Sequence, residues 1–515
     1  MSKESFIEAI KSSYPDSKPH IFLGCGVLDG EILSEARVNI PLSMMNRHGM
    51  VAGATGSGKT RTLQLLAEQL SKAGVPVFLS DIKGDLSGLG VPGKTNAKLE
   101  ERAEALGIKF EPSGVPVELY SLSGNNGAQM RATVMEFGPI LLSKILELND
   151  TQTGVLTILF KYADDHALPI VDLNDLKKVL NYLSEGPGKE EIRANYGSIS
   201  TSSSGTILRK IVALEQQEVD KIFGEPSFEI ADLMQKVDGQ GVVSILNVSD
   251  MQDKPDVFST FLLSLLAELY QTLPEAGDLD KPKLVFFLDE AHLLFNDAPK
   301  AFLEQIEQIV RLIRSKGVGI FFCSQMAQDL PDSVLSQLGN RVQHVLRSFT
   351  PKDAKAIKDT VHTYPRSEYY KIDETLTQLG IGQALITVLN SKGIPTEVAY
   401  THLVPPVAVM GPMIQQEVDD LLRKSELYAK YRTTVDPESA FEILDKRIRG
   451  IEKEEEQIQT KVEEVKPQTS GRKEKSVIEE VMSSSVTRTI GRELVRGIFG
   501  VLFGKKTTTR RTTRR

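Results

Sequence analysis

The sequence is poor in cysteine: Cys25 and Cys323 are the only two among 515 residues. Two cysteines are too few for a disulfide framework or a cysteine zinc site, so we expect both to be buried as small apolar residues. The chain also has no run near the roughly 18 apolar residues that a membrane-spanning helix needs. Its start, MSKESFIEAIKSSYP, lacks the apolar segment of a signal peptide. We therefore expect a cytoplasmic protein without a transmembrane segment.

Positive charge is not in excess either, because the formal net charge is −8. A protein that coats nucleic acid through its overall charge needs surplus Lys and Arg, so that class is disfavoured, although a local basic channel stays open. Apolar and charged fractions of 40% and 25% are those of an ordinary globular protein. The length exceeds the roughly 100 to 200 residues of a single core. We expect one large α/β domain with an insertion and a separate tail.

Short apolar runs alternate with amphipathic helical patterns from about residue 47 to 410, which indicates a mostly parallel sheet. A strand-rich segment, 1–46, precedes this core and contains HIFLGCGV and ARVNIPL, which predict a small antiparallel element. Several core runs are apolar at every residue, as expected for strands covered by helices on both faces. The predicted core strands are GMVAG, VPVFLSD, VELYSL, GVVSILNV, KLVFFLDE, GIFFCSQ, VQHVLR and QALITVL.

Helical periodicity replaces strand signals between VELYSL and GVVSILNV, so we predict an all-helical insertion at about residues 130–236. The polar stretch SISTSSSGT at 198–206 is typical of an N-cap region before the last of these helices. Beyond the core, we predict a helical segment over 411–465. Within it, Asp436 and Pro437 look like the N-cap and first-turn pair of a long helix. Its apolar residues recur in steps of three and four, which fits a coiled coil or a long helix laid on the domain: Phe441, Leu444, Ile448, Ile451, Ile458, Val462 and Val465.

The last segment, 466–515, is predicted to hold a polar linker, an amphipathic helix and a basic tail. Arg488, Arg492 and Arg496 form a basic row on that helix. It can bind acidic lipid, nucleic acid, another subunit or its own protein.

A phosphate-binding loop is predicted at residues 53–60, GATGSGKT, which match G-x-x-x-x-G-K-[ST] between a strand and an amphipathic helix. Glycines let main-chain amides turn toward phosphate oxygens, and the following helix supplies its positive end. Lys59 would reach the β and γ oxygens, and Thr60 would bind Mg²⁺. The predicted nucleotide-binding residues are Gly53, Ala54, Thr55, Gly56, Ser57, Gly58, Lys59, Thr60 and Arg61.

Two carboxylates, Asp289 and Glu290, follow the apolar run LVFFL at the predicted ligand-binding edge of the sheet. Adjacent carboxylates repel each other, so a purely structural role does not explain why two of them lie side by side. We expect Asp289 to hold Mg²⁺ and Glu290 to activate water as a general base. A second carboxylate for water favours hydrolysis of ATP over phosphate transfer to a small molecule.

Five motifs in this order resemble the HerA/FtsK group of P-loop ATPases, and within it the YjgR-like branch of HerA-like helicases. They are NRHGMVAGATGSGKT, VFLSDIKGDLSGL, LVFFLDEAHLLF, LIRSKGVGIFFCSQ and LGIGQALITVLNSKGIPT, and the likeness covers about residues 18–410. The resemblance implies a RecA-like core that assembles as a hexameric ring and pumps double-stranded DNA. The sequence departs from the pattern at Gln383, where an acidic residue is expected. It also has a shorter segment before the phosphate-binding loop than the family pattern has.

Carried over residue by residue, the resemblance assigns further catalytic roles. Gln325 would be the polar sensor on the next strand, and Asp81 would lie near the γ-phosphate, although it can also simply cap the turn DIKGDL. Arg314 would reach into a neighbouring subunit's site and stabilise charge on the transferring phosphoryl group. It can equally be a solvated helix end, with Arg311 and Arg341 as substitutes. His48 and His292 are expected to be structural.

Two functions remain in competition on the sequence alone. The first is an oligomeric, ATP-hydrolysing HerA-like motor acting on DNA. The second is a nucleotide-dependent scaffold or switch that acts through protein partners bound by the tail, which the acidic composition favours. DEAH, residues 289–292, also occurs in superfamily-2 helicases, but the arginine-rich late motif of those enzymes is missing from the sequence.

Overall fold

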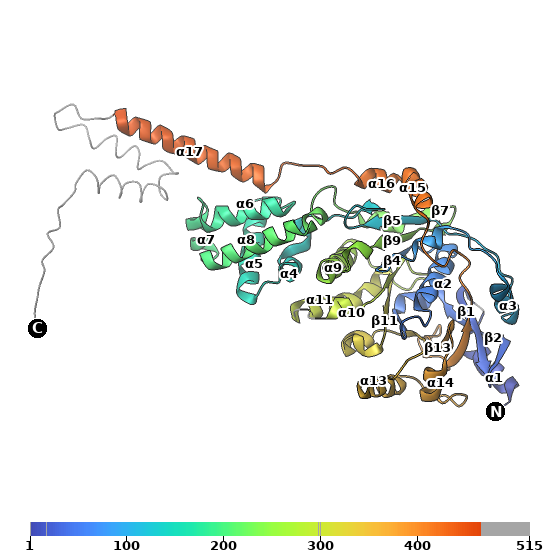
Figure 1. The fold of residues 1–515 in the computed structure, drawn as a ribbon. Coiled ribbons are helices and arrows are strands. Elements are labelled where there is room, and N and C mark those ends of the chain that lie inside the picture. The colour runs from blue at the N-terminus through green and yellow to red at the C-terminus, as the bar shows by residue number, and fades with distance from the viewer. Residues whose placement is uncertain (1, 17, 297, 299, 465–515) are drawn as a thin grey trace, which may run out of the picture.

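The computed structural model describes residues 2–16, 18–296, 298 and 300–464 (Figure 1). The predicted linker, amphipathic helix and basic tail of 466–515 lie outside these residues. Within the described part of the chain, no helix is both long enough and apolar enough to cross a membrane.

One large sheet organises the molecule, and in the described residues it has twelve strands in the order β2-β1-β14-β13-β12-β3-β11-β10-β4-β9-β5-β6. The eight strands from β12 to β6 are parallel to their neighbours, and β13, β14, β1 and β2 extend the sheet in antiparallel fashion. Their bounds are β1 His20–Leu28, β2 Glu31–Pro41, β3 Gly49–Ala52, β4 Val77–Asp81, β5 Val117–Ser121, β6 Ala128–Gln129, β9 Val243–Asn247, β10 Leu284–Leu288, β11 Val318–Ser324, β12 Asn340–Gln343, β13 Gln383–Thr387 and β14 Ala399–Leu403. The mostly parallel α/β core is confirmed.

The central strands are apolar on both faces because each face carries its own core. In β10, Phe286 and Leu288 enter one buried cluster, whereas Val285 and Phe287 enter the other. The second cluster contains the apolar side of α2 (Lys59–Lys72) and of the N-terminal helix α1 (Lys3–Ser13). The first contains α9 (Pro255–Thr272), α10 (His292–Phe295) and α11 (Lys300–Leu312). The sheet is therefore the middle of three layers.

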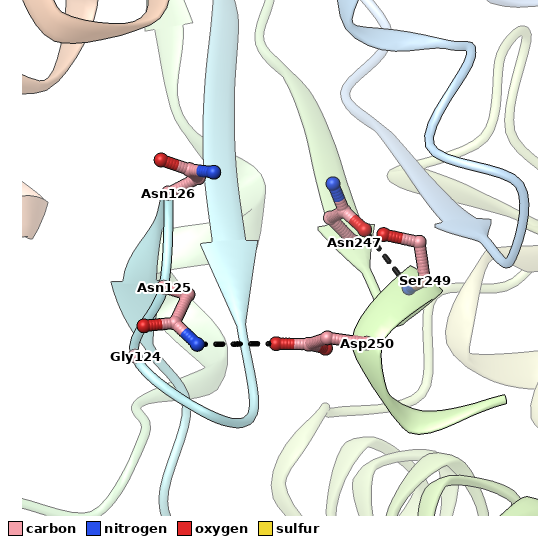
Figure 2. Close-up of a pocket in the computed structure, with 6 residues that line it drawn as sticks. All are labelled: Gly124, Asn125, Asn126, Asn247, Ser249 and Asp250. Atoms are coloured by element: carbon pink, nitrogen blue, oxygen red, sulfur yellow. Dashed lines mark hydrogen bonds between the residues drawn. The ribbon is translucent and has the colours of Figure 1, made fainter. Parts of the chain in front are cut away.

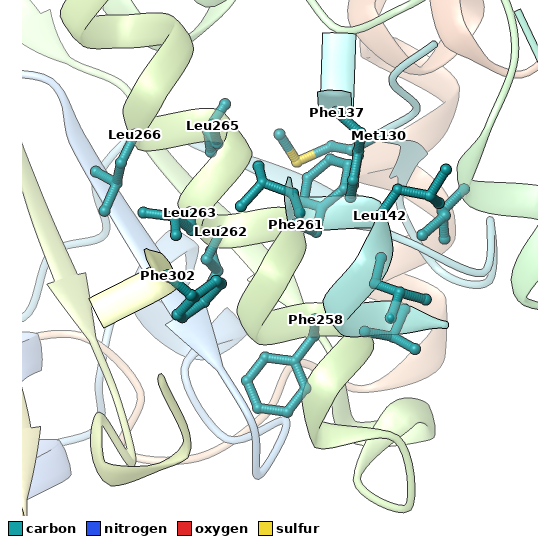
Figure 3. Close-up of a cluster of buried hydrophobic side chains, with 14 of the residues drawn as sticks. Met130, Phe137, Leu142, Phe258, Phe261, Leu262, Leu263, Leu265, Leu266 and Phe302 are labelled. Carbon is teal, nitrogen blue, oxygen red and sulfur yellow. The ribbon is translucent and has the colours of Figure 1, made fainter. Parts of the chain in front are cut away.

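The first cluster continues from the sheet into the helices that precede β9. Figure 3 shows Phe258 and Phe261 of α9 beside Phe137 and Leu142 of α4. These helices are α4 Val134–Ile145, α5 Asp150–Asp165, α6 Leu173–Ser184, α7 Lys189–Asn195 and α8 Thr201–Gln216, and a small hairpin, β7 Lys236–Val237 and β8 Gln240–Gly241, follows them. Helix α8 begins inside the predicted N-cap region, with the Ser200 hydroxyl accepting the Ser203 amide at 3.1 Å.

The remaining helices of the described chain are α3 Ala97–Ala105, α12 Asp332–Leu335, α13 Pro351–His362, α14 Ile372–Gln378, α15 Gln415–Lys424, α16 Glu426–Tyr431 and α17 Ala440–Glu464. Several strand assignments differ from the sequence prediction, and β6 and the hairpin of β7 and β8 were not predicted. Strand β12 covers 340–343 rather than 342–347, because the chain leaves the ladder and the Val345 carbonyl accepts the Ala54 amide of the phosphate loop at 2.9 Å. Strand β14 was not predicted.

The predicted start of the C-terminal helix is wrong. Helix α17 begins at Ala440, and Asp436 and Pro437 lie outside it. The start is fixed locally by the Glu442 carboxylate, which accepts the Ser439 amide at 2.9 Å, and from outside by the Asp175 carboxylate of α6, which accepts the Phe441 amide at 2.8 Å. The first turns of α17 pack on α6, and the helix then extends away from the body (Figure 1). The interpretation of this segment as a long helix that packs on the domain therefore holds for the first turns of α17.

Candidate active site

The phosphate loop joins β3 to α2 and has the backbone that its glycines predict. Gly53, Gly56 and Gly58 have φ values of +153°, +76° and +111°, which L residues rarely adopt. A Cβ on Gly53 would lie 2.5 Å from the Cβ of His344 and 2.9 Å from the Ser57 hydroxyl. A Cβ on Gly56 would meet nothing within 4 Å. The base of the loop is thus closely packed, and its tip is open.

Lys59 points back into the loop that it follows. Its ammonium donates to the carbonyls of Gly53 at 2.7 Å and Ala54 at 3.3 Å, and the residue is 6% exposed. Buried ammonium groups need oxygen partners. Main-chain carbonyls supply them here, and phosphate oxygens at the same place would be stronger partners because they are charged.

The other loop residues divide between the interior and the surface. Ser57 is buried, and its hydroxyl has no hydrogen-bond partner in the described residues. Thr55 is exposed and Thr60 partly exposed at the start of α2. Arg61 donates to Gln64 at 2.6 Å and lies 3.8 Å from the Asp85 carboxylate. An unpartnered buried hydroxyl inside a turn of amides is what a bound anion would satisfy.

Sheet register brings the distant predicted residues to one edge. Ala52 of β3 pairs with Ser324 of β11, and Leu288 of β10 lies between Phe322 of β11 and Ser80 of β4. Because these strands are parallel, the residues that follow them emerge on the same side as the phosphate loop. Gly53, Gln325, Asp289 and Asp81 are therefore neighbours in space, although Lys59 and Asp289 are far apart in sequence.

Asp289 is the buried carboxylate of the pair. It is 5% exposed, and its Oδ1 accepts the Glu290 amide at 3.0 Å. Burial raises the pKa of Asp289 above its usual range, against the opposing influence of the Lys83 ammonium. No cluster of three or more His, Cys, Asp or Glu suited to a metal occurs among the described residues. One carboxylate and the Thr60 hydroxyl fit Mg²⁺, which typically takes one or two protein ligands together with substrate phosphates.

Glu290 adopts a conformation that non-glycine residues avoid, with φ of +45°. Its Oε1 lies 3.1 Å from the Lys83 ammonium, and its side chain is 14% exposed. Its Oε2 lies 3.4 Å from His292 Nδ1 but is buried without a hydrogen bond. Burial lowers the pKa of Lys83, but the carboxylates of Asp289 and Glu290 outweigh burial and hold that pKa above its usual value.

Asp81 caps the turn that follows β4. Its Oδ1 accepts the amides of Gly84 at 2.8 Å and Asp85 at 3.2 Å, and its Oδ2 accepts the Leu86 amide at 2.9 Å. Burial nevertheless raises the pKa of Asp81 to about 6. The capping role is therefore present in the structure, and a catalytic role for Asp81 stays a prediction.

Gln325 and Arg314 stand at opposite ends of β11. Gln325 follows the strand at the phosphate-loop edge and is exposed. Arg314 lies in the short 3-10 helix η6, Ile313–Lys316, before the strand. The seven residues of β11 separate them by about 20 Å at roughly 3.3 Å per residue. An arginine side chain cannot cover that distance, so Arg314 cannot reach the phosphate loop of its own chain.

The substitutes for Arg314 occupy different places. Arg311 is exposed at the end of α11. Arg341 lies within β12, where its Nε is 3.5 Å from the Leu338 carbonyl. The unexpected Gln383 has a structural use, because its Oε1 accepts the Tyr400 hydroxyl at 2.8 Å and the Gly380 amide at 2.6 Å. Cys25 and Cys323 are both buried, as predicted.

Two residues of the site were missed by sequence reasoning. His344 lies under the loop, with Nε2 2.9 Å from the Thr62 hydroxyl and Nδ1 3.0 Å from the Gln383 carbonyl. Burial lowers the pKa of His344 to about 4, so the ring is neutral and Nδ1 carries the proton. The other is Lys83, inside the motif DIKGDL. Neither has a signal of its own, because both act through partners distant in sequence.

A polar cleft of about 490 Å³ lies to one side of these residues, beyond the ends of β5 and β9 (Figure 2). Asn125 of one loop donates to Asp250 of the other at 3.4 Å. The cleft borders the turn after β4, since a Cβ on Gly84 would lie 3.4 Å from the Ser249 hydroxyl. None of the predicted site residues lines it.

Comparison with known proteins gives a consistent family. The family model described as "Helicase HerA-like C-terminal" matches residues 28–508. The DNA double-strand break repair helicase HerA of Sulfolobus acidocaldarius is 21% identical over 401 residues, which is 77% of this chain and 73% of that protein. Its counterpart in Sulfurisphaera tokodaii is 24% identical over 404 residues, or 75% and 70% of the two chains.

Among solved structures, the plasmid coupling protein TrwB has a similar fold. Its complexes with a non-hydrolysable GTP analogue and a non-hydrolysable ATP analogue each have a TM-score of 0.50 and 14% identity. Each comparison covers 80% of this chain and 95% of the other. At that identity the likeness concerns the fold, and it agrees with a RecA-like P-loop core.

Proposed function

The chain belongs to the helicase HerA-like C-terminal family, and on that premise we propose that it is an ATP-hydrolysing motor that acts on double-stranded DNA. The observation that carries the proposal is the register of the parallel sheet, in which β3, which leads into the phosphate loop, and β10, which ends before Asp289 and Glu290, flank β11 and end at the same edge. Hydrolysis of a nucleoside triphosphate requires two halves of a site. One half is a loop that binds the phosphates, and the other is a pair of carboxylates at the end of a neighbouring strand.

Each half has a defined task. The loop amides and Lys59 bind the phosphates, and Thr60 and Asp289 hold Mg²⁺. When bound, Mg²⁺ would neutralise the charge that develops on the phosphate oxygens. Glu290 accepts a proton from the attacking water, Gln325 orients the γ-phosphate, and Asp81 fixes the turn beside it.

The active unit is a ring of like subunits, and a hexamer is the state expected for this family. Arg314 supports an assembly because it lies at the edge of the sheet opposite its own phosphate loop. A head-to-tail neighbour would place that arginine over the next subunit's γ-phosphate, where it would stabilise the charge of the transition state.

The test is ATP turnover by the full chain with Mg²⁺, with and without duplex DNA. We expect stimulation by DNA that weakens steeply with added salt, because phosphate contacts release counterions. Glu290→Gln should bind ATP without turnover, and Lys59→Ala should lose binding. Turnover that duplex DNA leaves unchanged at every salt concentration would remove DNA from the proposal, and full turnover by Glu290→Gln would remove the mechanism.

A second candidate, a nucleotide-dependent scaffold, is favoured by the part of α17 that extends beyond α6 (Figure 1). Deleting 450–515 discriminates the two, because it removes the extended part of α17 and spares the buried contacts of Tyr431 and Leu444 with the body. A motor should keep its DNA-stimulated turnover after this deletion. A scaffold should lose partner binding while its slow hydrolysis is unchanged.

A further inference from the structure

We propose that Lys83 is a positioning residue that holds Glu290 in a non-hydrolytic orientation and must release it before each turnover. This inference rests on the proposed function of Glu290 as the general base. It goes beyond that function by assigning a role to a lysine that none of the five sequence motifs singles out for chemistry.

The first support is the state of the two Glu290 oxygens. A general base must offer one carboxylate oxygen to the water that it activates. Oε1 is taken by the Lys83 ammonium at 3.1 Å. Oε2 is closed off from solvent, with His292 Nδ1 at 3.4 Å and no hydrogen bond. In this arrangement one oxygen of Glu290 is engaged by a cation and the other is shielded from solvent.

The second support is the backbone of Glu290. A non-glycine residue with a φ of +45° is strained, and such a conformation persists only where the surroundings hold it. The backbone is held by the Asp289 carboxylate, which accepts the Glu290 amide at 3.0 Å, and by the Glu290 carbonyl, which accepts the Leu293 amide at 3.0 Å. The side chain is held by the ion pair with Lys83, so loss of that contact can change the orientation of the carboxylate without moving the backbone.

The third support is the contrast between the backbone and the side chain of Lys83. Its turn is fixed on both sides, because Asp81 accepts three amides of the turn and the Ile82 carbonyl accepts the Gln252 amide group at 2.7 Å. The Lys83 side chain itself is 43% exposed. A firm backbone with a mobile, solvent-facing ammonium suits a contact that forms and breaks repeatedly.

The fourth support is the charge that a nucleotide would bring. A bound triphosphate places several negative charges beside Asp289 and Glu290, and these compete with the carboxylates for the same ammonium. Separating Lys83 from Glu290 then becomes part of the barrier to hydrolysis. Removing the ammonium should lower that barrier while leaving the phosphate loop intact.

The experiment measures ATP turnover of the full chain carrying Lys83→Ala, without DNA. We expect kcat to rise by about threefold or more while KM for ATP changes by less than about twofold, because the loop that binds ATP is unaltered. Lys83→Arg should keep the wild-type kcat, since it restores the positive charge at Glu290. Lys221→Ala removes another lysine paired with a glutamate, at 2.7 Å from Glu218, and is the matched control.

The double variant Lys83→Ala/Glu290→Gln shows whether the effect passes through Glu290, and it should be as inactive as Glu290→Gln alone. A kcat of Lys83→Ala equal to or below that of the wild type overturns the inference, as does a raised kcat in Lys83→Arg. A wild type without any turnover refutes the proposed function itself and this inference with it. Turnover in the wild type with no gain in Lys83→Ala refutes the inference alone.

Discussion

Gly53 shows how one residue joins the phosphate loop to the rest of the site. Its φ of +153° aims the chain into the loop, and its missing Cβ leaves room for His344. His344 in turn forms hydrogen bonds with the Thr62 hydroxyl of α2 and the Gln383 carbonyl at the start of β13. The loop is therefore supported from below by a neutral histidine, and its shape depends on that contact.

Gly53→Ala should weaken ATP binding by at least about tenfold, since overpacking of this kind typically costs 1–3 kcal/mol. The added Cβ would lie 2.5 Å from the Cβ of His344. Titration with a fluorescent ATP analogue measures the affinity. Gly56→Ala is the control, because its φ is also positive but its Cβ enters open space. Equal losses in both variants would mean that backbone strain, not contact with His344, limits the loop.

Asp81 gives a pH-dependent prediction. Its native pKa of about 6 lies above the usual 3.8, so the native state binds a proton more tightly than the unfolded state does. The stability that Asp81 contributes is thus complete below about pH 4 and is lost as pH rises through about 6, by up to about 3 kcal/mol.

Asp81→Asn should remove that dependence. The Tm of the wild type relative to the variant should fall between pH 4 and pH 6 in thermal melts without nucleotide. Asp85→Asn should move the fall in Tm to lower pH, because the charge of Asp85 helps to raise the pKa of Asp81. Parallel Tm curves for wild type and Asp81→Asn would contradict the assignment.

At the scale of elements, α17 begins where another helix allows it to begin. The Asp175 carboxylate accepts the Phe441 amide through Oδ1, and through Oδ2 it accepts the Val171 amide at 2.8 Å. It therefore satisfies unpaired amides at the starts of both α6 and α17. The ion pair between Lys178 and Asp445, at 3.0 Å, is a second and more exposed link.

Asp175→Ala should detach the first turns of α17, because it leaves buried donors unpaired at about 1–3 kcal/mol each. Hydrogen exchange of residues 440–448 is the measurement, and faster exchange there with little change in β10 is expected. Asp445→Ala breaks only the partly exposed ion pairs with Lys178 and Arg449 and should cost less than about 1 kcal/mol. Unchanged exchange in Asp175→Ala would place the anchor of α17 elsewhere, for instance in the buried Leu444.

At the scale of the whole molecule, the direction of the sheet decides which residues can share a site. Gln325 and Arg314 flank the same strand, and only Gln325 lies at the edge of the phosphate loop. The acidic pair and the arginine of one chain consequently belong to different sites. Hydrolysis that depends on both requires at least two chains.

Mixing Arg314→Ala with Glu290→Gln should restore turnover that neither variant has alone. In a mixed ring, an Arg314→Ala subunit keeps Glu290 and receives Arg314 from a Glu290→Gln neighbour. Turnover as a function of the mixing ratio should pass through a maximum near equal amounts. Using Arg311→Ala or Arg341→Ala in place of Arg314→Ala identifies the acting arginine, and an additive, inactive mixture for all three would argue against an arginine supplied in trans.

Local pattern was enough for most of the fold. The run LVFFL is apolar throughout and VFLSD is apolar in its first three residues, which predicts strands buried on both faces, and both are buried at every residue. The phosphate loop is a contiguous motif, and three of its glycines have the positive φ that its tight turn requires. Asp436 was misassigned because the local cap lies three residues later, where Glu442 accepts the Ser439 amide at 2.9 Å, and because Asp175 of α6 adds a cap that no local pattern indicates.

By itself, the sequence determined the mostly parallel core, the phosphate loop, and a carboxylate pair at a strand end, because each is written in neighbouring residues with their own periodicity or geometry. Only the tertiary structure decided that Lys83 restrains Glu290, that His344 supports Gly53, and that Arg314 faces away from its own loop. Those relations depend on strand order, strand direction and register, which bring together residues that no local pattern connects.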